Sequence, residues 1–280
     1  MGEKIIETAT VRKIRKFLNR AANNKEMAFL FGPTGRGKTV TVREWLSTRP
    51  EGIYFRADTG ITLSRLRRNL SLAILGNETG SSRDIVEYLL TRPGSVLIVD
   101  EAVHVCSECF TAQDIKRLDY LRDIYDNVNE QGGSFSLVMI FTDCKLSRFK
   151  NGRASRFLGQ FIGRMDDHLD IGDKISLPYE IKPVLSAYGL PENLAQTAFK
   201  IANGPGKMRT LYKCLAFAVK LAEKRNITVS AENLEDIFNR LDSVSAQRDT
   251  CHRLFRKKIR DFLKNYLDSG FQNGGSRESI

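Results

Sequence analysis

Apolar residues follow two alternating spacings along the first part of this chain. Short, largely apolar runs of strand length occupy residues 27–32, 52–57, 95–100 and 136–143. Between them, apolar positions recur at helical spacing in residues 8–22, 62–75, 83–91 and 111–130. Strands that alternate with helices in this way predict a mostly parallel sheet covered by helices on both faces. We therefore expect an α/β fold in this part of the chain.

The spacing changes after about residue 178, beyond which only helical periodicity is found. Pro191 lies at the expected start of one helix, and Ser230 is placed to cap another. A basic helix is expected at residues 251–267, followed by a polar tail without apolar periodicity. We predict three parts: an α/β nucleotide-binding base at 1–178, a small helical domain at 179–245, and a basic helix with a disordered tail at 246–280.

A glycine-rich motif connects the first strand to the helix that follows it. Residues 32–39 read GPTGRGKT, which is the full spacing of a phosphate-binding loop between a buried strand and a helix. Glycines allow backbone N–H groups to surround a phosphate, and the helix N-terminus favours the same negative charge. The alternative is a glycine-rich turn that arises by chance. The predicted nucleotide-binding residues are Gly32, Pro33, Thr34, Gly35, Arg36, Gly37, Lys38 and Thr39.

Two of these side chains have individual roles, and a second motif completes the site. Lys38 is expected to reach the β- and γ-phosphate oxygens of ATP, and the Thr39 hydroxyl to bind Mg²⁺. Residues 95–102, SVLIVDEA, place Asp100 and Glu101 at the end of a buried strand. We expect Asp100 to hold Mg²⁺ through water and Glu101 to orient an attacking water, although both acids would also suit a helix N-cap. A base placed for water favours hydrolysis, so the sequence predicts an ATPase.

Composition narrows the range of partners. The chain has 280 residues, of which 41% are hydrophobic and 28% charged, and its net charge is +11. A basic balance of this size favours a polyanionic partner such as nucleic acid. No apolar run has the length of a membrane span, and the N-terminus has no apolar signal core. We therefore expect a cytoplasmic protein with no membrane partner.

Cysteines offer one further candidate site. His104, Cys106 and Cys109 lie close together, and Cys-x-x-Cys spacing is typical of zinc or redox sites. A structural zinc site needs four ligands, and no second Cys-x-x-Cys or His pair follows. We therefore favour ordinary packing cysteines over a metal site.

A phosphate-loop sheet followed by a helical domain resembles the AAA+ ATPases, and the compact layout is most similar to their transposition regulators, the group of the phage Mu B protein and TnsC. The resemblance covers about residues 5–245. It implies a polar sensor at Thr142, with Asp143 as the less favoured choice, and a second sensor at Arg209 in the helical lid. It also implies an arginine finger that acts on the neighbouring subunit. The candidates for this finger are Arg164, which we prefer, Arg156 and Arg153.

The resemblance also implies a function. It predicts an ATP- and Mg²⁺-dependent protein that forms a ring or helical filament on duplex DNA and selects target sites for a transposase or related recombination protein. Residues 1–26 leave room for one helix only, so DNA contacts are expected from the ATPase itself. The alternatives are a replication initiator or loader, and an ATP-switched protein adaptor that does not bind DNA. The predicted DNA-contacting residues are Arg65, Arg67, Arg68, Arg148 and Lys150.

Overall fold

The computed structural model describes residues 5–106, 111–143, 163 and 165–241. The chain divides into two compact units, Met1–Leu211 and Tyr212–Ile280, and each is described by itself. The division falls inside a helix, and the predicted domain boundaries at 178 and 245 remain predictions. The predicted basic helix at 251–267 lies outside the described residues.

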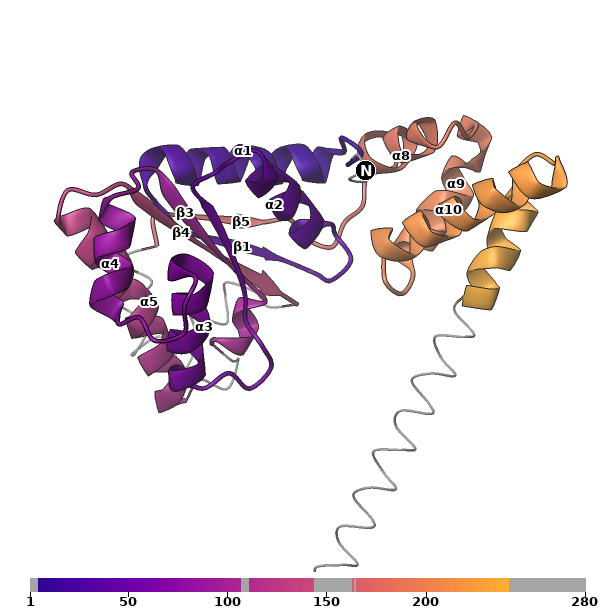
Figure 1. Cartoon of the computed structure of the whole chain (residues 1–280). Helices are drawn as coiled ribbons and strands as arrows, with labels where there is room; N and C mark the ends of the chain where they lie inside the picture. Colours follow the sequence, from indigo (N-terminus) through magenta and orange to yellow (C-terminus); the bar gives the residue numbers. More distant parts are fainter. Residues whose placement is uncertain (1–4, 107–110, 144–162, 164, 242–280) are drawn as a thin grey trace, which may run out of the picture. The chain divides into compact units, whose positions relative to one another are not determined.

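A five-stranded sheet forms the centre of the first unit (Figure 1). Every pairing in it is parallel, and the strand order is β2-β3-β4-β1-β5. The register places Gly32 opposite Thr142 and Arg56 opposite Asp100, so the carboxyl ends of four strands meet at one edge. The strands are β1 (Met27–Gly32), β2 (Gly52–Arg56), β3 (Ser95–Asp100), β4 (Phe135–Thr142) and β5 (Asp167–Asp170).

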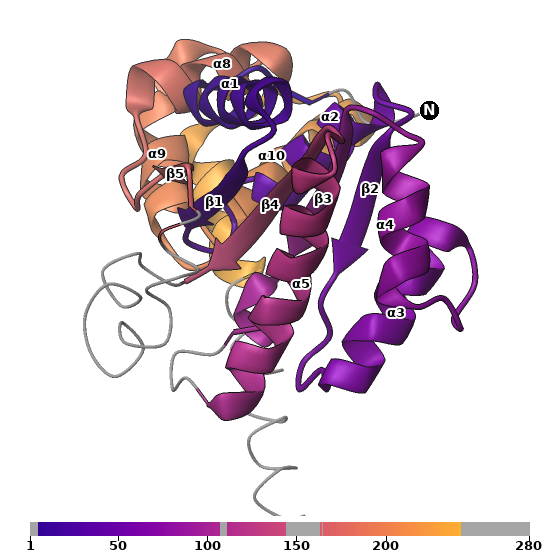
Figure 2. The ribbon, with the colours of Figure 1, turned by 90° about the vertical axis from the view of Figure 1, so that its left-hand side faces the viewer.

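Helices cover both faces of this sheet, as Figures 1 and 2 show. Two of them pack on one face: α1 (Ala9–Asn24) and α2 (Lys38–Ser47). Three pack on the other: α3 (Leu63–Leu75), α4 (Ser82–Leu90) and α5 (Ala112–Glu130). Side chains alternate between the two faces of a strand, so β4 contributes Val138 and Ile140 to one core and Met139 and Phe141 to the other. The predicted parallel sheet with helices on both faces is confirmed.

Polar caps set where several helices begin. The side chains of Thr8 and Thr62 accept backbone N–H groups at the starts of α1 and α3. Full capping boxes start α4 and α5, in which Ser81 pairs with Asp84 and Thr111 pairs with Asp114. These short-range signals explain why the predicted helix starts lie within a residue or two of the observed ones.

Beyond β5, the described residues of the first unit form short helices only. They are a π-helical turn η2 (Leu177–Ile181), α8 (Lys182–Ala187), a one-turn 3₁₀ helix η3 (Glu192–Leu194), α9 (Ala195–Asn203) and the first turn of α10 (Met208–Arg225). In the second unit, the rest of α10 is followed by helical residues 231–241, where the Ser230 hydroxyl accepts the Asn233 N–H at 3.2 Å. Within the part of the chain that the structure describes, no helix has the length and apolar composition that crossing a membrane requires.

Candidate functional site

The loop between β1 and α2 lies at the carboxyl edge of the sheet. Gly37 has a φ of +82° at the N-cap of α2, a left-handed conformation that glycine adopts at little cost. A Cβ atom on Gly35 would lie 2.3 Å from the carbonyl oxygen of Gly206, so this loop and the segment before α10 come too close for a side chain. The sequence therefore places glycines where the backbone needs them, and the N-terminus of α2 points its free N–H groups into the loop.

Lys38 lies under this loop. Its Nζ donates to the carbonyl oxygens of Gly32 and Pro33, both at 2.8 Å, and the side chain is buried. Burial lowers the pKa of Lys38 to about 8, although the nearby carboxylates of Asp143, Asp100 and Glu101 act in the opposite direction. A cation held by backbone carbonyls at a helix N-terminus suits a phosphate group, whose negative charge would strengthen the protonated form.

Asp100 accepts hydrogen bonds at both carboxylate oxygens. Thr39 Oγ1 donates to its Oδ2 at 2.8 Å, and the Tyr54 hydroxyl donates to the same oxygen at 2.7 Å. Oδ1 accepts the backbone N–H of Glu101 at 2.8 Å. Hydroxyl and carboxylate oxygens are the hard ligands that Mg²⁺ prefers, so Thr39 and Asp100 fit the predicted metal site. The metal, when bound, would neutralise charge on a phosphate.

Tyr54 contacts Asp100 but is not among the site residues predicted from the sequence. Burial and the hydrogen bond to Asp100 raise the pKa of Tyr54 to about 12. The sequence signal for this contact is the alternation of side chains along β2, which places Tyr54 and Arg56 on one face of that strand. This face could not be assigned to the site before β2 and β3 were known to be neighbours.

Glu101 follows the same strand in an unusual conformation. Its φ of 54° and ψ of 41° lie in the left-handed region, which is uncommon for a residue with a side chain. The Glu101 side chain makes no capping hydrogen bond to the one-turn helix η1 (Ala102–His104) that follows, which argues against a role as a helix cap. Its Oε1 lies 3.9 Å from Nη2 of Arg56, and the side chain is about a quarter exposed. A partly exposed carboxylate next to the phosphate loop is suited to act as a general base that activates an attacking water.

The end of β4 also reaches the phosphate loop. Thr142 is the last residue of this strand and pairs with Gly32. Asp143 follows with a φ of 55°, its N–H donates to the Gly32 carbonyl at 3.2 Å, and its Oδ1 accepts the Thr34 N–H at 2.9 Å. Of the two sensor candidates, the less favoured Asp143 is the one with a side-chain hydrogen bond to the loop.

Arg209 lies in the first turn of α10 with an exposed side chain. Its positive charge is one of the causes that lower the pKa of Lys38, so the structure brings these two cations into one electrostatic environment. This placement agrees with the predicted second sensor, whose role remains a prediction.

Arg36 differs from the other loop residues because its guanidinium is directed away from the surface. The side chain is 2% exposed, and its Nη2 lies 3.0 Å from Oε1 of Glu180 in η2. The same Nη2 donates to Thr10 Oγ1 and to the Lys174 carbonyl, both at 3.1 Å, while Nε and Nη1 are buried without a partner. Thr10 also donates to Glu180. The predicted contribution of Arg36 to phosphate binding is therefore left to its backbone, and its side chain joins the loop to the helical segment.

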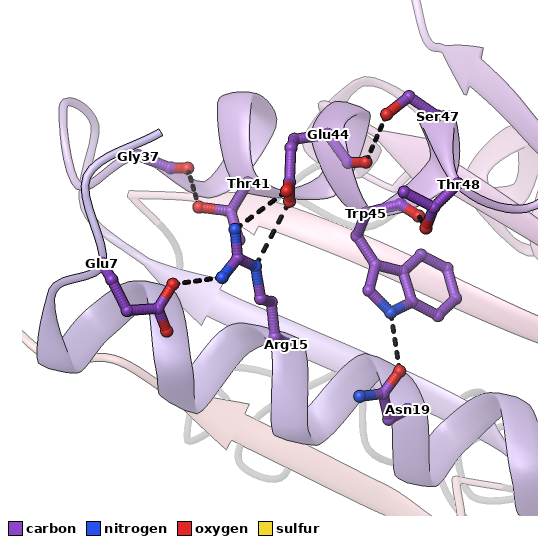
Figure 3. Close-up of polar contacts among 9 residues, drawn as sticks. All are labelled: Glu7, Arg15, Asn19, Gly37, Thr41, Glu44, Trp45, Ser47 and Thr48. Atoms are coloured by element: carbon purple, nitrogen blue, oxygen red, sulfur yellow. Dashed lines mark hydrogen bonds and ion pairs between the residues drawn. The ribbon is translucent and has the colours of Figure 1, made fainter. Parts of the chain in front are cut away.

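Polar contacts join α1 to α2, the helix that follows the loop (Figure 3). Arg15 donates to Glu44 through Nε at 3.2 Å and Nη2 at 2.9 Å, and it also pairs with Glu7. Trp45 Nε1 donates to Asn19 Oδ1 at 2.8 Å. These bonds join α1 to the second half of α2, the helix that begins at Lys38.

The predicted DNA-contacting arginines on α3 are exposed, but each has a partner. Arg65 lies 3.3 Å from Asp58, and Arg68 lies 3.5 Å from Glu78. Arg67 stacks over the Tyr120 ring at 5.1 Å. DNA would have to compete with these contacts. The other candidates for DNA contacts and for the arginine finger lie outside the described residues. They are Arg148, Lys150, Arg153, Arg156 and Arg164.

The cysteine candidate gains no support from the described residues. Cys106 is buried, and Cys109 lies outside the described part of the chain. Within the described ranges, no group of three or more His, Cys, Asp or Glu side chains is arranged to hold a metal ion.

Known proteins share this architecture. Residues 20–148 match the family model described as an AAA domain. A Walker-type ATPase of Pyrococcus abyssi superposes with a TM-score of 0.62 at 16% identity, over 98% of this chain and 87% of that one. The ORC2 protein of Aeropyrum pernix, in ADPNP–ADP complexes, gives 0.58 at 13%, over 85% and 70%. Domain III of the replication initiation protein DnaA of Thermotoga maritima gives 0.53 at 11%, over 84% and 94%.

Among the curated proteins, none matches this sequence. At identities this low, the solved structures bear on the fold alone. The parallel sheet, the phosphate loop and the Thr39–Asp100 pair agree with that fold. The chain thus has the fold of a P-loop NTPase, and its residues 20–148 carry the match to an AAA domain.

Proposed function

We propose that this protein is an ATPase that binds duplex DNA in its ATP-bound state, assembles on it as a ring or filament, and directs a transposase or related recombination protein to its target. The observation that carries the ATPase part is the pairing of Thr39 with Asp100 beside the buried Lys38. Glu101, partly exposed at the same edge, is the base for water. ATP and Mg²⁺ are the cofactors of this proposal.

We assign the sensor and arginine-finger residues the roles that the resemblance to AAA+ ATPases implies. Arg209 contacts the γ-phosphate side of the site from α10, and Asp143 shares the sensor position with Thr142, because its carboxylate already binds the loop. Arg164 serves as the finger for a neighbouring subunit, with Arg156 as the alternative. Under this proposal the γ-phosphate holds subunits together, and its hydrolysis releases them.

The DNA part of the proposal is supported by charge. The chain carries a net charge of +11, and α3 presents three exposed arginines on one helix. Arginines without interleaved aromatic stacking side chains suit phosphate contacts on a duplex rather than base recognition. Phosphate contacts carry no sequence information, so we expect binding to most duplex sequences.

A protein-binding adaptor that does not touch DNA is the second candidate, and one observation favours it. All three arginines of α3 already have acidic or aromatic partners within the chain. A replication initiator or loader is the other alternative. The DnaA domain of Thermotoga maritima shares the fold, but the fold does not separate initiation from transposition.

The deciding experiment measures ATP hydrolysis with and without duplex DNA, together with electron microscopy of protein, duplex and a non-hydrolysable ATP analogue. Stimulated hydrolysis and ordered assemblies on the duplex are expected. A rate of ATP hydrolysis that DNA does not change, together with no assembly on the duplex, would favour the adaptor.

A further inference from the structure

Tyr54 lies beside the predicted metal site without belonging to any predicted motif. Its hydroxyl donates to Oδ2 of Asp100 at 2.7 Å, and that same oxygen accepts the Thr39 hydroxyl at 2.8 Å. A carboxylate oxygen has two lone pairs, so these two donors fill Oδ2. Because Asp100 is 1% exposed, water does not compete freely for this oxygen.

The sheet register explains how Tyr54 reaches Asp100. β2 and β3 are parallel neighbours, with Tyr54 opposite Ile98 and Arg56 opposite Asp100. Side chains two residues apart lie on one face of a strand, so Tyr54 and Asp100 both face the side covered by α1 and α2. A tyrosine is long enough to extend past one strand position, which brings its hydroxyl to the carboxylate.

Arg43 contacts both the ring and the hydroxyl of Tyr54. Its guanidinium carbon lies 4.7 Å from the ring centroid of Tyr54, and its Nη2 lies 3.4 Å from the hydroxyl oxygen. Arg43 and Thr39 are four residues apart on α2, so both project from one side of that helix. One helix therefore supplies a proposed metal ligand and the residue that orients Tyr54.

We propose that Tyr54 is a positioning residue for the magnesium site, which fixes the Asp100 carboxylate so that Asp100 and Thr39 present their oxygens to the metal together. This role rests on the proposed Mg²⁺-dependent nucleotide binding. Groups that hydrogen-bond to a metal's ligands typically change metal affinity or activity by about 10- to 100-fold when they are removed. Tyr54 itself touches no nucleotide in this role and acts only through Asp100.

Tyr54→Phe is the informative substitution, because it removes the hydroxyl and keeps the ring that stacks with Arg43. Tyr125→Phe is the matched control. The Tyr125 hydroxyl also donates a 2.7 Å hydrogen bond, to the Lys25 carbonyl. Lys25 precedes β1 and Gly32 ends it, so this control lies at the opposite end of the strand, about 20 Å from the site.

The experiment titrates MgCl₂ into full-length protein mixed with a fluorescent ADP analogue, and measures nucleotide affinity in EDTA alongside. We expect Tyr54→Phe to raise the half-saturating Mg²⁺ concentration about 10-fold or more, with its affinity in EDTA unchanged. We expect Tyr125→Phe to match the wild type in both measurements.

Two results would overturn the role. One is a Tyr54→Phe titration that coincides with the wild type. The other is an equal loss of affinity with and without Mg²⁺, which would make Tyr54 a structural residue of the pocket. A wild-type protein that binds no nucleotide at any Mg²⁺ concentration would overturn the proposed ATPase function as well, and this failure is distinguishable because it precedes any substitution.

Discussion

Lys38 and Glu101 lie at the same edge of the sheet, but their surroundings give them different chemistry. Lys38 is buried and held by two carbonyl oxygens of its own loop. Glu101 is partly exposed, and its backbone is held in the left-handed region at the end of β3. In the proposed function, a buried cation on a phosphate loop would act in ground-state binding, whereas a partly exposed carboxylate at the same edge would act on the attacking water.

Lys38→Ala and Glu101→Gln should therefore fail in different ways. Lys38→Ala removes charge-assisted hydrogen bonds to phosphate, and ATP affinity should fall at least about 10-fold. Glu101→Gln should bind ATP nearly as the wild type does and lose turnover by about 100-fold or more. Equilibrium binding and single-turnover hydrolysis measure the two effects separately.

Glu44→Gln is the control for a lost carboxylate. Glu44 bonds to Arg15 on the face of α2 that packs against α1, as Figure 3 shows. It should change neither binding nor turnover by more than a few fold. Equal loss of ATP affinity in Lys38→Ala and Glu101→Gln would contradict this division of roles.

One buried ion pair joins the phosphate loop to the helical segment. Arg36 and Glu180 are 2% and 4% exposed, and Thr10 of α1 bonds to both. Removing one member of a buried pair leaves the other charge without compensation, whereas replacing both with apolar residues is often neutral. The contact therefore joins three elements that are distant in sequence, and its loss should show in stability.

Glu180→Met should destabilise the protein by about 3 to 5 kcal/mol, because it leaves Arg36 charged and buried. The double variant Arg36→Met with Glu180→Met should recover most of that loss. Urea unfolding followed by the fluorescence of Trp45, the single tryptophan of the chain, measures both. Lys182→Met, which breaks an exposed pair with Glu192 at 3.1 Å, is the control and should cost less than about 1 kcal/mol. A Glu180→Met loss as small as the control's would refute the coupling.

The sequence alone predicts the local features of these elements but not the contacts between distant residues. Four of the five strands, the helix starts and the phosphate loop are coded by residues close together in the chain, so local spacing predicts them. The four residues of β5, DHLD, form no apolar run. Arg36–Glu180 and Tyr54–Asp100 join residues 144 and 46 positions apart. Such contacts depend on which elements become neighbours, and no local pattern encodes this. The contact of Asp143 with Thr34 spans 109 positions and is likewise not encoded locally.

In the proposed function, DNA would be held either by the overall net charge of +11 or by particular arginines. The α3 arginines lie on the sheet face opposite to α1, and the ion pairs of Arg65 and Arg68 are exposed. Exposed pairs contribute little, about 0 to 1 kcal/mol, so a phosphate is able to displace the acidic partner. If DNA lies along α3, Asp58 and Glu78 compete with it for the arginines. No such competition is expected if DNA is held only by the overall positive charge of the protein.

Two pairs of substitutions that remove equal charge separate a specific DNA surface from overall charge. Arg65→Gln with Arg68→Gln should weaken ATP-dependent duplex binding and reduce its salt dependence between about 50 and 200 mM. Arg12→Gln with Lys16→Gln should change binding little. These two α1 residues are exposed, and neither has an ion pair within the described ranges.

Removing the competing acids should have the opposite effect. Asp58→Asn with Glu78→Gln frees Arg65 and Arg68, so duplex affinity should rise, and it should rise most at low salt where phosphate attraction is least screened. Fluorescence anisotropy of a labelled duplex, with ATP analogue and across a salt series, measures all three variants. If the α1 and α3 pairs weaken binding equally and the acid variant changes nothing, then charge alone holds the DNA and α3 is not the contact surface.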